Sequence, residues 1–461
     1  MPCPIGRSMI RHKGVTMEPT GIIDKIESFL KGRSLDGYEI FLSASRNLTI
    51  EVKDRKVDTF RCSAPIGVGV RVLRSRGMGF SFSTSLDDSD LLKMIDNAMT
   101  SAEFQTPDEF NMFPLPEAYP RIDGLFDEGL AGIDEGEKIG KAMELERLTL
   151  AADPRVTKVR KAAYGESNYE GHIRNSLGVT GNYRDTSITC SVSAIAEEGN
   201  DSQMGWDFGF SNLFSGVDVA MIAKTAADKA SGLLGARKIP TMRCPAVLDN
   251  HVATEILEVL SPSFLADSVR KGKSLLAKQA GEEIFSPILR IRDDGTLAGG
   301  MVTAPFDGEG APQRNTLLVE NGRLNGFLYD TYHAKRSGTV STGNATRSSS
   351  KNPPAMGVSN FFIENGQTPL AGLLQGIERG VLITSVMGMH TANPISGDFS
   401  VGAAGFLIEN GVVTAPVKGI AIAGNILELF KSVELAGNDL RFFGAVGAPS
   451  LRISALDVSG E

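Results

Sequence analysis

The chain has 461 residues, of which 41% are hydrophobic and 22% are charged, and its formal net charge is −8. This length and composition are typical of a globular protein with two domains, because single hydrophobic cores stop growing at about 250–300 residues. The acidic balance, together with the absence of a Lys/Arg cluster interleaved with aromatic residues, excludes an extended nucleic-acid-binding surface.

No segment of the sequence predicts contact with a membrane. The first sixteen residues, MPCPIGRSMIRHKGVT, carry positive charge but no apolar core, so they do not read as a signal peptide. No run approaches the about 18 apolar residues of a membrane-spanning helix. We therefore expect a cytoplasmic protein in which residues 1–16 form a disordered extension.

The first half of the chain alternates between helical and strand patterns. Apolar residues at helical spacing predict helices over about 22–30, 91–99, 139–152 and 217–234. Runs that are typical of strands lie between them, at 38–43, 48–53, 67–73, 79–84, 156–160, 172–175, 179–183 and 186–195. In the last of these, Ile188, Cys190, Val192 and Ala194 alternate with Ser or Thr, which indicates one buried face. The short connections favour antiparallel pairing, so residues 17–236 are predicted to form an α+β domain with an antiparallel sheet and covering helices.

Beyond a boundary at about residues 235–242, helical patterns become rare. A buried strand at 246–249 precedes a helix that we expect to be capped by Asn250 and stopped by Pro262. The phrase apolar triplet, Glu, Asn, Gly occurs three times, at 317–322, 361–366 and 406–411. Asn-Gly suits a type I′ turn, so each copy predicts a hairpin tip. Residues 243–461 are therefore predicted to form a mainly-β domain, either barrel-like or a large curved sheet.

One stretch gathers polar residues and glycines between two apolar runs, GMHTANPISGDFSVGAAGFLIENG at Gly388–Gly411. It contains His390, Asn393, Ser396 and Asp398. Long loops of this kind are usually functional or disordered. A surface loop without chemistry explains the residues equally well.

Common catalytic and metal-binding patterns are missing from the sequence. There is no helical pair of histidines with an adjacent Glu and no G-x-S-x-G motif, and the four cysteines fall in no metal-ligand spacing. The Pro305–Gly310 turn offers two carboxylates, for which a solvated turn is the simpler interpretation. Gly-rich segments at 297–301, 338–344 and 397–405 are consistent either with an open backbone edge for an extended peptide or with barrel bends.

Several long phrases in one order make the chain similar to the TldD/PmbA family, in particular to its PmbA branch, also called TldE. They are GVGVRV (Gly67–Val72), PFDGEG (Pro305–Gly310), LLVENGRLNGFLYD (Leu317–Asp330), STGNATR (Ser341–Arg347) and the Gly388–Gly411 stretch. The resemblance runs from about Tyr38 onward. It implies a cytoplasmic metalloprotease, in which a TldD-type subunit pairs with a TldE-type subunit and acts in peptide maturation and in proteolysis of unfolded peptides. The family was first labelled a modulator of DNA gyrase.

The resemblance also locates a degenerate metal motif. The family's catalytic subunit binds its metal through a helical H-E-x-x-x-H motif. Counted back from Gly281-Glu282, this motif falls on residues 257–262, where Glu258 is retained but Leu257 and Pro262 replace the two histidines. Neither replacement can ligate a metal. The resemblance therefore implies no catalytic residue and no metal in this chain, which would be inactive alone, and zinc in a TldD-type partner.

Three hypotheses follow. The leading one is a non-metal-binding subunit that supplies half of a peptide chamber, with His390, Asn393, Ser396 and Asp398 as candidate substrate-binding residues. The second is a standalone homodimeric module that binds peptides or proteins, linked to gyrase or to a toxin–antitoxin pair, without proteolysis. The third is a metal site formed by His390, another His and a carboxylate.

Overall fold

The computed structural model describes residues 11–12, 15–16 and 18–460. Of the extension expected at residues 1–16, β1 (Arg11–His12) and β2 (Val15–Thr16) are described, and they pair antiparallel. The rest of that prediction lies outside the described residues. Among the described residues, no helix is both long and apolar enough to span a membrane.

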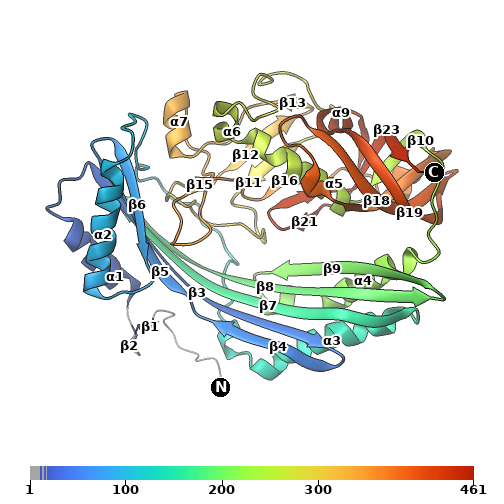
Figure 1. The fold of residues 1–461 in the computed structure, drawn as a ribbon, viewed down its shortest axis with the longest axis horizontal. Coiled ribbons are helices and arrows are strands. Elements are labelled where there is room, and N and C mark those ends of the chain that lie inside the picture. Colours follow the sequence, from blue (N-terminus) through green and yellow to red (C-terminus); the bar gives the residue numbers. More distant parts are fainter. Residues whose placement is uncertain (1–10, 13–14, 17, 461) are drawn as a thin grey trace.

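The first half of the chain is one curved antiparallel sheet with the order β6-β5-β3-β7-β8-β9, and β4 pairs with β3 (Figure 1). Its strands are β3 (Gly37–Lys53), β4 (Lys56–Ser63), β5 (Ile66–Arg74), β6 (Gly77–Ser83), β7 (Val156–Asn175), β8 (Thr180–Glu198) and β9 (Asp201–Ser211). The predicted antiparallel α+β architecture of this half is confirmed.

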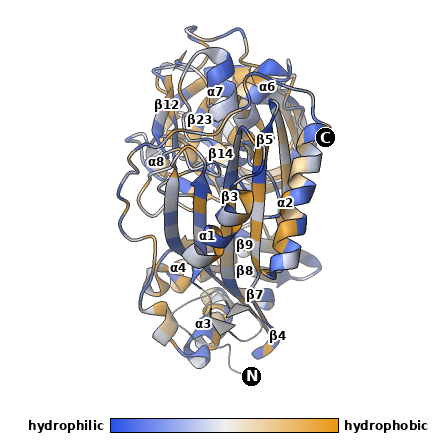
Figure 2. Ribbon diagram, turned by 90° about the vertical axis from the view of Figure 1, so that its left-hand side faces the viewer, coloured by the Kyte–Doolittle hydropathy of each residue, from blue (hydrophilic) through white to orange (hydrophobic). Residues whose placement is uncertain are grey.

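Helices cover one face of this sheet. They are α1 (Pro19–Leu30), α2 (Asp88–Glu103), α3 (Glu135–Ala152) and α4 (Val219–Gly232), with the 3-10 turns η1 (Leu130–Gly132) and η2 (Phe214–Gly216). Ile40 and Leu42 pack against α1 and α2, whereas Ile50 and Ile188 pack against α3 and α4. Figure 2 shows the resulting alternation of hydrophobic and hydrophilic residues along α2 and the strands beside it. The other face of the sheet, which is concave, lies toward the second half of the chain (Figure 1).

Three strands of this sheet each join two strands that the sequence predicts separately. β3 joins those expected at 38–43 and 48–53, β7 joins those expected at 156–160 and 172–175, and β8 joins those expected at 179–183 and 186–195. The linking residues that face the concave side include Ser45, Ser167 and Gly171, which are polar or lack a side chain. The apolar pattern is interrupted there although the strand continues.

The second half contains a closed five-stranded barrel, as the barrel-like prediction expects. The barrel closes because β23 pairs with β19 on one side and with β10 on the other. Its strands are β10 (Met242–Leu248), β17 (Arg379–Met387), β18 (Asp398–Glu409), β19 (Val412–Asn425) and β23 (Leu451–Ser459), and β20 (Val433–Ala436) adds to β23.

A second sheet packs beside the barrel, with the order β13-β12-β11-β16-β22-β21. Its strands are β11 (Ile291–Asp294), β12 (Asn315–Glu320), β13 (Arg323–Leu324), β16 (Phe361–Ile363), β21 (Arg441–Phe443) and β22 (Val446–Ala448), and β14 (Ala345–Thr346) pairs with β15 (Ala355–Met356). The helices here are α5 (Asn250–Leu260), α6 (Ala266–Arg270), α7 (Thr331–Ser337), α8 (Leu370–Leu374), α9 (Ile426–Lys431), η3 (Ser261–Phe264) and η4 (Met389–Thr391). Side chains of α5, the barrel and this sheet share one large core.

Two of the three repeated phrases are hairpin tips, as predicted. Asn321-Gly322 and Asn410-Gly411 have consecutive positive φ values, near 50° for each Asn and near 80° for each Gly, as a type I′ turn requires. The prediction is wrong for the copy at 361–366, where Gly366 does not have positive φ. There a Cβ on Gly366 would lie 2.1 Å from the carbonyl oxygen of Ala436, so the glycine permits close backbone approach.

Candidate functional site

The helix that carries the degenerate motif is α5. It begins at Asp249, whose carboxylate accepts a hydrogen bond from the N–H of Val252 at 2.8 Å, so the predicted cap at Asn250 is wrong by one residue. Leu257 is fully buried in the core, whereas Glu258 is exposed. At Ser261 the helix gives way to η3, with the exposed Pro262 in its first turn. The two positions that would need imidazoles thus hold a core side chain and a helix-ending proline.

Within the described chain, no three His, Cys, Asp or Glu side chains are placed to hold a metal ion together. Glu258 therefore lacks convergent ligands, and zinc does not fit this helix. The third hypothesis, a metal site at His390, likewise lacks the second His and the carboxylate that it requires.

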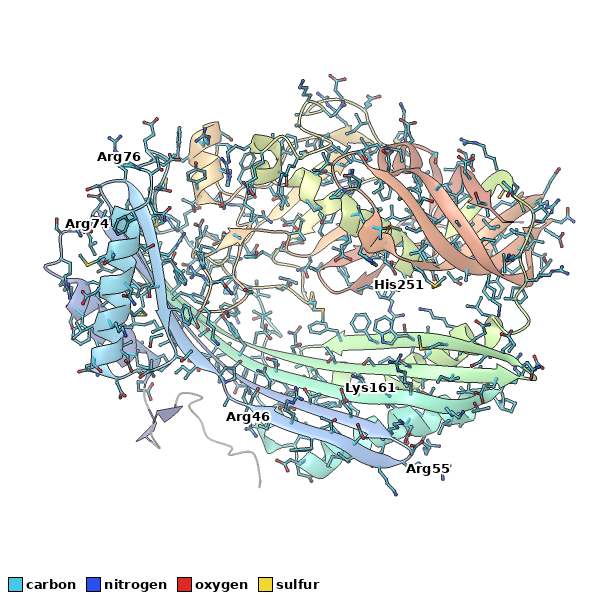
Figure 3. The ribbon with its side chains drawn as sticks, viewed as in Figure 1. Arg46, Arg55, Arg74, Arg76, Lys161 and His251 are labelled. Atoms are coloured by element: carbon cyan, nitrogen blue, oxygen red, sulfur yellow. The ribbon has the colours of Figure 1, made fainter. Side chains whose placement is uncertain are left out.

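The half-buried face of α5 carries His251 and Glu255 at i and i+4, and His251 Nε2 lies 3.4 Å from Glu255 Oε1. Burial, with the positive charges of Lys229 and Arg441, lowers the pKa of His251 to about 4. Burial and the charge of Glu258 raise the pKa of Glu255 to about 7. His251 is therefore neutral at pH 7, and it faces the sheet of the first half (Figure 3).

Aromatic rings pack around His251. Its ring centroid lies 4.5 Å from that of Phe443 and 6.1 Å from that of Trp206, and Trp206 stacks on Phe208 at 5.4 Å. Arg441 donates to Asp207 at 2.9 Å and to the carbonyl of Phe208. Strand β9 is thereby joined to α5 and β21. Sequence reasoning missed this cluster, because its members come from three distant segments.

The loop between β17 and β18, at the start of the Gly388–Gly411 stretch, brings together three of the four predicted site residues: Asn393, Ser396 and Asp398. The Asn393 side chain accepts hydrogen bonds from the N–H groups of Ile395 (2.9 Å) and Ser396 (3.2 Å), and Asn425 donates to Asp398 at 3.0 Å. These bonds hold the loop against the start of β18. His390 is exposed on η4 and makes no hydrogen bond with them. A substrate contact by His390, Asn393, Ser396 or Asp398 stays a prediction.

The phrases GVGVRV, PFDGEG and STGNATR meet in one buried ion-pair network. Arg71 donates from Nε to Glu39 at 3.0 Å and from Nη1 to Glu309 at 2.9 Å, and Arg347 pairs with the same Glu39. The side chains of all four residues are less than a tenth exposed. The network joins β3 and β5 of the first half to two loops of the second.

The solvated turn expected at Pro305–Gly310 is therefore wrong, since Asp307 and Glu309 are each 4% exposed. Asp307 accepts hydrogen bonds from the N–H groups of Glu309, Ala311 and Ala345. Burial, followed by the charge of Glu309, raises the pKa of Asp307. A sequence window could not show this, because Arg71 and Glu309 are 238 positions apart.

The middle of the concave face is lined by short polar side chains, which we call the hydroxyl floor. Its members are half-buried and share a face by strand register: Ser45, Asn47, Thr49, Ser167, Ser187, Thr189, Ser191 and Ser193. The hydroxyls of Ser187, Thr189, Ser191 and Ser193 have no hydrogen-bond partner anywhere in the part of the chain described. The floor therefore offers free donors and acceptors to a polar ligand.

The two ends of the concave face are covered by the second half. At one end Phe306 packs against Phe41, Ile173 and Tyr183. At the other, Trp206 and Phe208 meet His251 and Phe443. The hydroxyl floor lies between these contacts.

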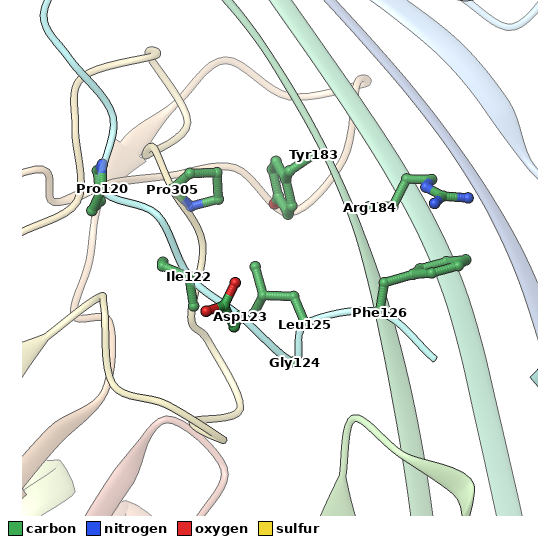
Figure 4. A pocket seen from close by; sticks show the side chains of 9 residues that line it. All are labelled: Pro120, Ile122, Asp123, Gly124, Leu125, Phe126, Tyr183, Arg184 and Pro305. Atoms are coloured by element: carbon green, nitrogen blue, oxygen red, sulfur yellow. The ribbon is translucent and has the colours of Figure 1, made fainter. Parts of the chain in front are cut away.

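A pocket of about 420 Å³ opens beside the Phe306 end (Figure 4). It is formed by the segment 120–126, by Tyr183 and Arg184 of β8 and by Pro305. The guanidinium of Arg184 lies 3.9 Å from the ring centroid of Phe126 and pairs with Glu128. Six of the lining side chains are apolar or aromatic, as in small-molecule and side-chain pockets.

Comparison with known proteins agrees with this geometry. The models of PmbA/TldA metallopeptidase domain 1, central domain and C-terminal domain match residues 38–102, 128–234 and 241–460. An uncharacterised protein of Methanocaldococcus jannaschii is 29% identical over 92% of this chain and 98% of its own length. The metalloprotease PmbA of Escherichia coli O157:H7 is 25% identical over 92% of this chain and 93% of its own.

Solved structures show the same fold along the whole chain. TldE from Thermococcus kodakarensis superposes with a TM-score of 0.87 at 25% identity and covers 96% of this chain and 99% of its own. A Thermotoga maritima protein, solved as a candidate modulator of a DNA gyrase, gives a TM-score of 0.87 at 26% identity, over 95% of this chain and all of its own. The chain belongs to the PmbA/TldD metallopeptidase family, on its PmbA, or TldE, branch.

Proposed function

We propose that this chain is the non-metal-binding subunit of a TldD/TldE-type metalloprotease and that it forms a wall which contacts an extended, unfolded peptide. The observation that carries the proposal is α5. A core leucine and a helix-ending proline stand where the catalytic subunit has its ligands, and no convergent donors replace them in the described chain. Zinc is then expected in a TldD-type partner, with which this chain would form a heterodimer.

The concave face supports a peptide-contacting role. The hydroxyl floor presents uncharged donors and acceptors, which suit the repeating amides of a peptide without selecting its side chains. Beside it, β9 pairs with β8 and with no other strand among the described residues. The carbonyl of Phe208 accepts a hydrogen bond from Arg441 and therefore points away from β8. Backbone groups alternate in direction along a strand, so those of Met204 and Trp206, four and two residues earlier, also point away from β8. An extended peptide could add as a strand there.

The experiment is reconstitution with the TldD-type subunit of the same organism. The purified chain alone should bind no stoichiometric zinc by elemental analysis, and should not cleave an unstructured reporter peptide. The two subunits together should elute as one complex and cleave the peptide, and a chelator should stop the reaction. Zinc-dependent cleavage by this chain alone would contradict the proposal.

A pair of variants tests the wall. Trp206→Ala removes an aromatic side chain that is 38% exposed beside the β9 edge, and should raise KM for an unfolded peptide by about tenfold, as for a lost stacking contact of about 1.4 kcal/mol. Met221→Ala, on the outer helix α4 and 52% exposed, is the matched control and should leave KM unchanged. If the two variants changed KM equally, the concave face would not contact the substrate.

The standalone homodimeric binding module is the second candidate, since the hydroxyl floor and the β9 edge would serve binding without proteolysis. Peptide binding by this chain alone, with no change in affinity and no cleavage when the TldD-type subunit is added, would favour it.

A further inference from the structure

Asp185 is a half-buried carboxylate without a partner. It makes no hydrogen bond and no ion pair with any described residue. Burial alone raises the pKa of Asp185, to about 6, with no cation near enough to oppose it. The fully buried acids Glu39 and Asp293, by contrast, have a counter-ion or an N–H donor. A carboxylate left in this state is a candidate binding group.

Asp185 is not itself in the lining of the 420 Å³ pocket, but it lies two residues from Tyr183, which is. Strand alternation puts it on the same concave face as Tyr183, two residues along β8. Neighbouring positions on one strand face are about 6.7 Å apart, a distance that one bound residue can bridge. Its cross-strand neighbour is Tyr169, whose ring centroid lies 5.5 Å from that of Tyr183. A pocket with apolar and aromatic side chains in its lining and an unpaired negative charge thus lie two residues apart along β8.

The other charges at the pocket leave Asp185 uncompensated. Asp123 is exposed and pairs with Arg121 at 3.2 Å. The Arg184 guanidinium is engaged by Glu128 and by the ring of Phe126. Alternation directs the Arg184 side chain to the face opposite that of Asp185. The carboxylate of Asp185 could therefore be neutralised by a cationic group of a ligand.

From the pocket and the unpaired Asp185, we infer a binding site for a primary ammonium attached to an apolar residue, with the apolar side chain in the pocket and the ammonium on the carboxylate. Within the proposed function this would be a subsite for the peptide on the concave face, and the inference rests on that function only for the origin of the ligand. The ammonium could come from a peptide N-terminus or from a lysine side chain.

Three small probes dissect the site on the isolated full chain, with affinity measured by saturation-transfer NMR at pH 7. Phenylalaninamide carries both the ring and the α-ammonium. N-acetylphenylalaninamide keeps the ring without the charge, and alaninamide keeps the charge without the ring. We expect each of the two incomplete probes to bind about tenfold more weakly than phenylalaninamide. N-acetyl-lysinamide distinguishes the sources, since binding as tight as that of phenylalaninamide assigns the site to a side-chain ammonium.

Asp185→Asn should reduce phenylalaninamide binding to the level of the acetylated probe. Asp58→Asn is the matched control, because it removes an exposed acid from β4 of the same sheet, outside the pocket, and should change little. Since Asp185 has no partner to lose, its replacement should not lower the melting temperature, so a loss of binding cannot be confused with misfolding. Equal binding of the acetylated and free probes, or wild-type affinity in Asp185→Asn, would overturn the inference. Neither result would bear on complex formation with a TldD-type subunit.

Discussion

Replacing Arg71 tests whether the buried ion-pair network holds the two halves of the molecule together. Arg71→Ala would leave Glu309, which is 4% exposed, with one remaining hydrogen bond, from the N–H of Thr331 at 3.0 Å. Arg347 would still neutralise Glu39. A buried charge stranded in this way costs about 3–5 kcal/mol. The loss falls on the junction between β5 and the loop at 305–310, so we expect the halves to unfold separately.

The assay is urea unfolding followed by both circular dichroism and tryptophan fluorescence, since the single Trp206 lies in the first half. Arg74→Ala is the matched control, because Arg74 lies on the same strand but pairs with Glu103 at the surface, where an ion pair contributes about 0–1 kcal/mol. Arg71→Ala should shift the transition by several times as much and separate the two signals. If both variants unfold alike, the network does not couple the halves.

The remaining predictions concern a titrating acid, a glycine and the motif helix. Because burial and Glu309 raise the folded-state pKa of Asp307 to about 8, the folded chain keeps a proton that the unfolded chain loses near pH 4. The contribution of Asp307 to stability should therefore fall as pH rises between 5 and 7, by up to about 1.4 kcal/mol per pH unit, and Asp307→Asn should reduce the slope of unfolding titrations by that amount. Gly366→Ala should lower the melting temperature by several degrees, since the new Cβ meets a backbone carbonyl at 2.1 Å, whereas Gly326→Ala meets nothing within 4 Å and should be neutral; equal melting temperatures would contradict the close approach. Leu257→His should destabilise the chain by about 2–5 kcal/mol and bind no zinc by elemental analysis, because the position is a sealed part of the core; a bound stoichiometric zinc would refute this reading of α5.

The sequence predicts a helix or strand correctly where one face of that element is apolar. Ile188 and Val192 alternate with polar residues, and this is the face of β8 that packs on α3 and α4. Asn321-Gly322 and Asn410-Gly411 turn as their backbone preferences require. The same signal fails at Ser45 and Ser167, because the face of the strand that carries them is half-buried and polar, so it gives no apolar alternation to detect.

The sequence predicts the candidate site only in part, because many of its contacts join segments that are distant in the sequence. The absence of imidazoles at Leu257 and Pro262 is a property of single positions, so the resemblance located it. The partners of Arg71 and the neighbours of Asp185 depend on which strands pair. Glu309 becomes a buried ion-pair partner only because the fold brings it to Arg71, which is 238 positions away in the sequence. No window of sequence distinguishes it from a solvated acid.

The two halves are joined by ion pairs at both ends of the concave face. Arg71 and Arg347 close one end, whereas Arg441 on Asp207, together with Lys418 on Asp201 at 2.8 Å, closes the other. These contacts do not involve Leu257 or Pro262, so the loss of metal ligands from α5 need not disturb the wall. Under the proposed function, the chain would lack the chemistry of this helix and still retain the surface that a peptide would touch. The floor hydroxyls of Ser187, Thr189, Ser191 and Ser193, which have no hydrogen-bond partner among the described residues, would then stay available to that peptide.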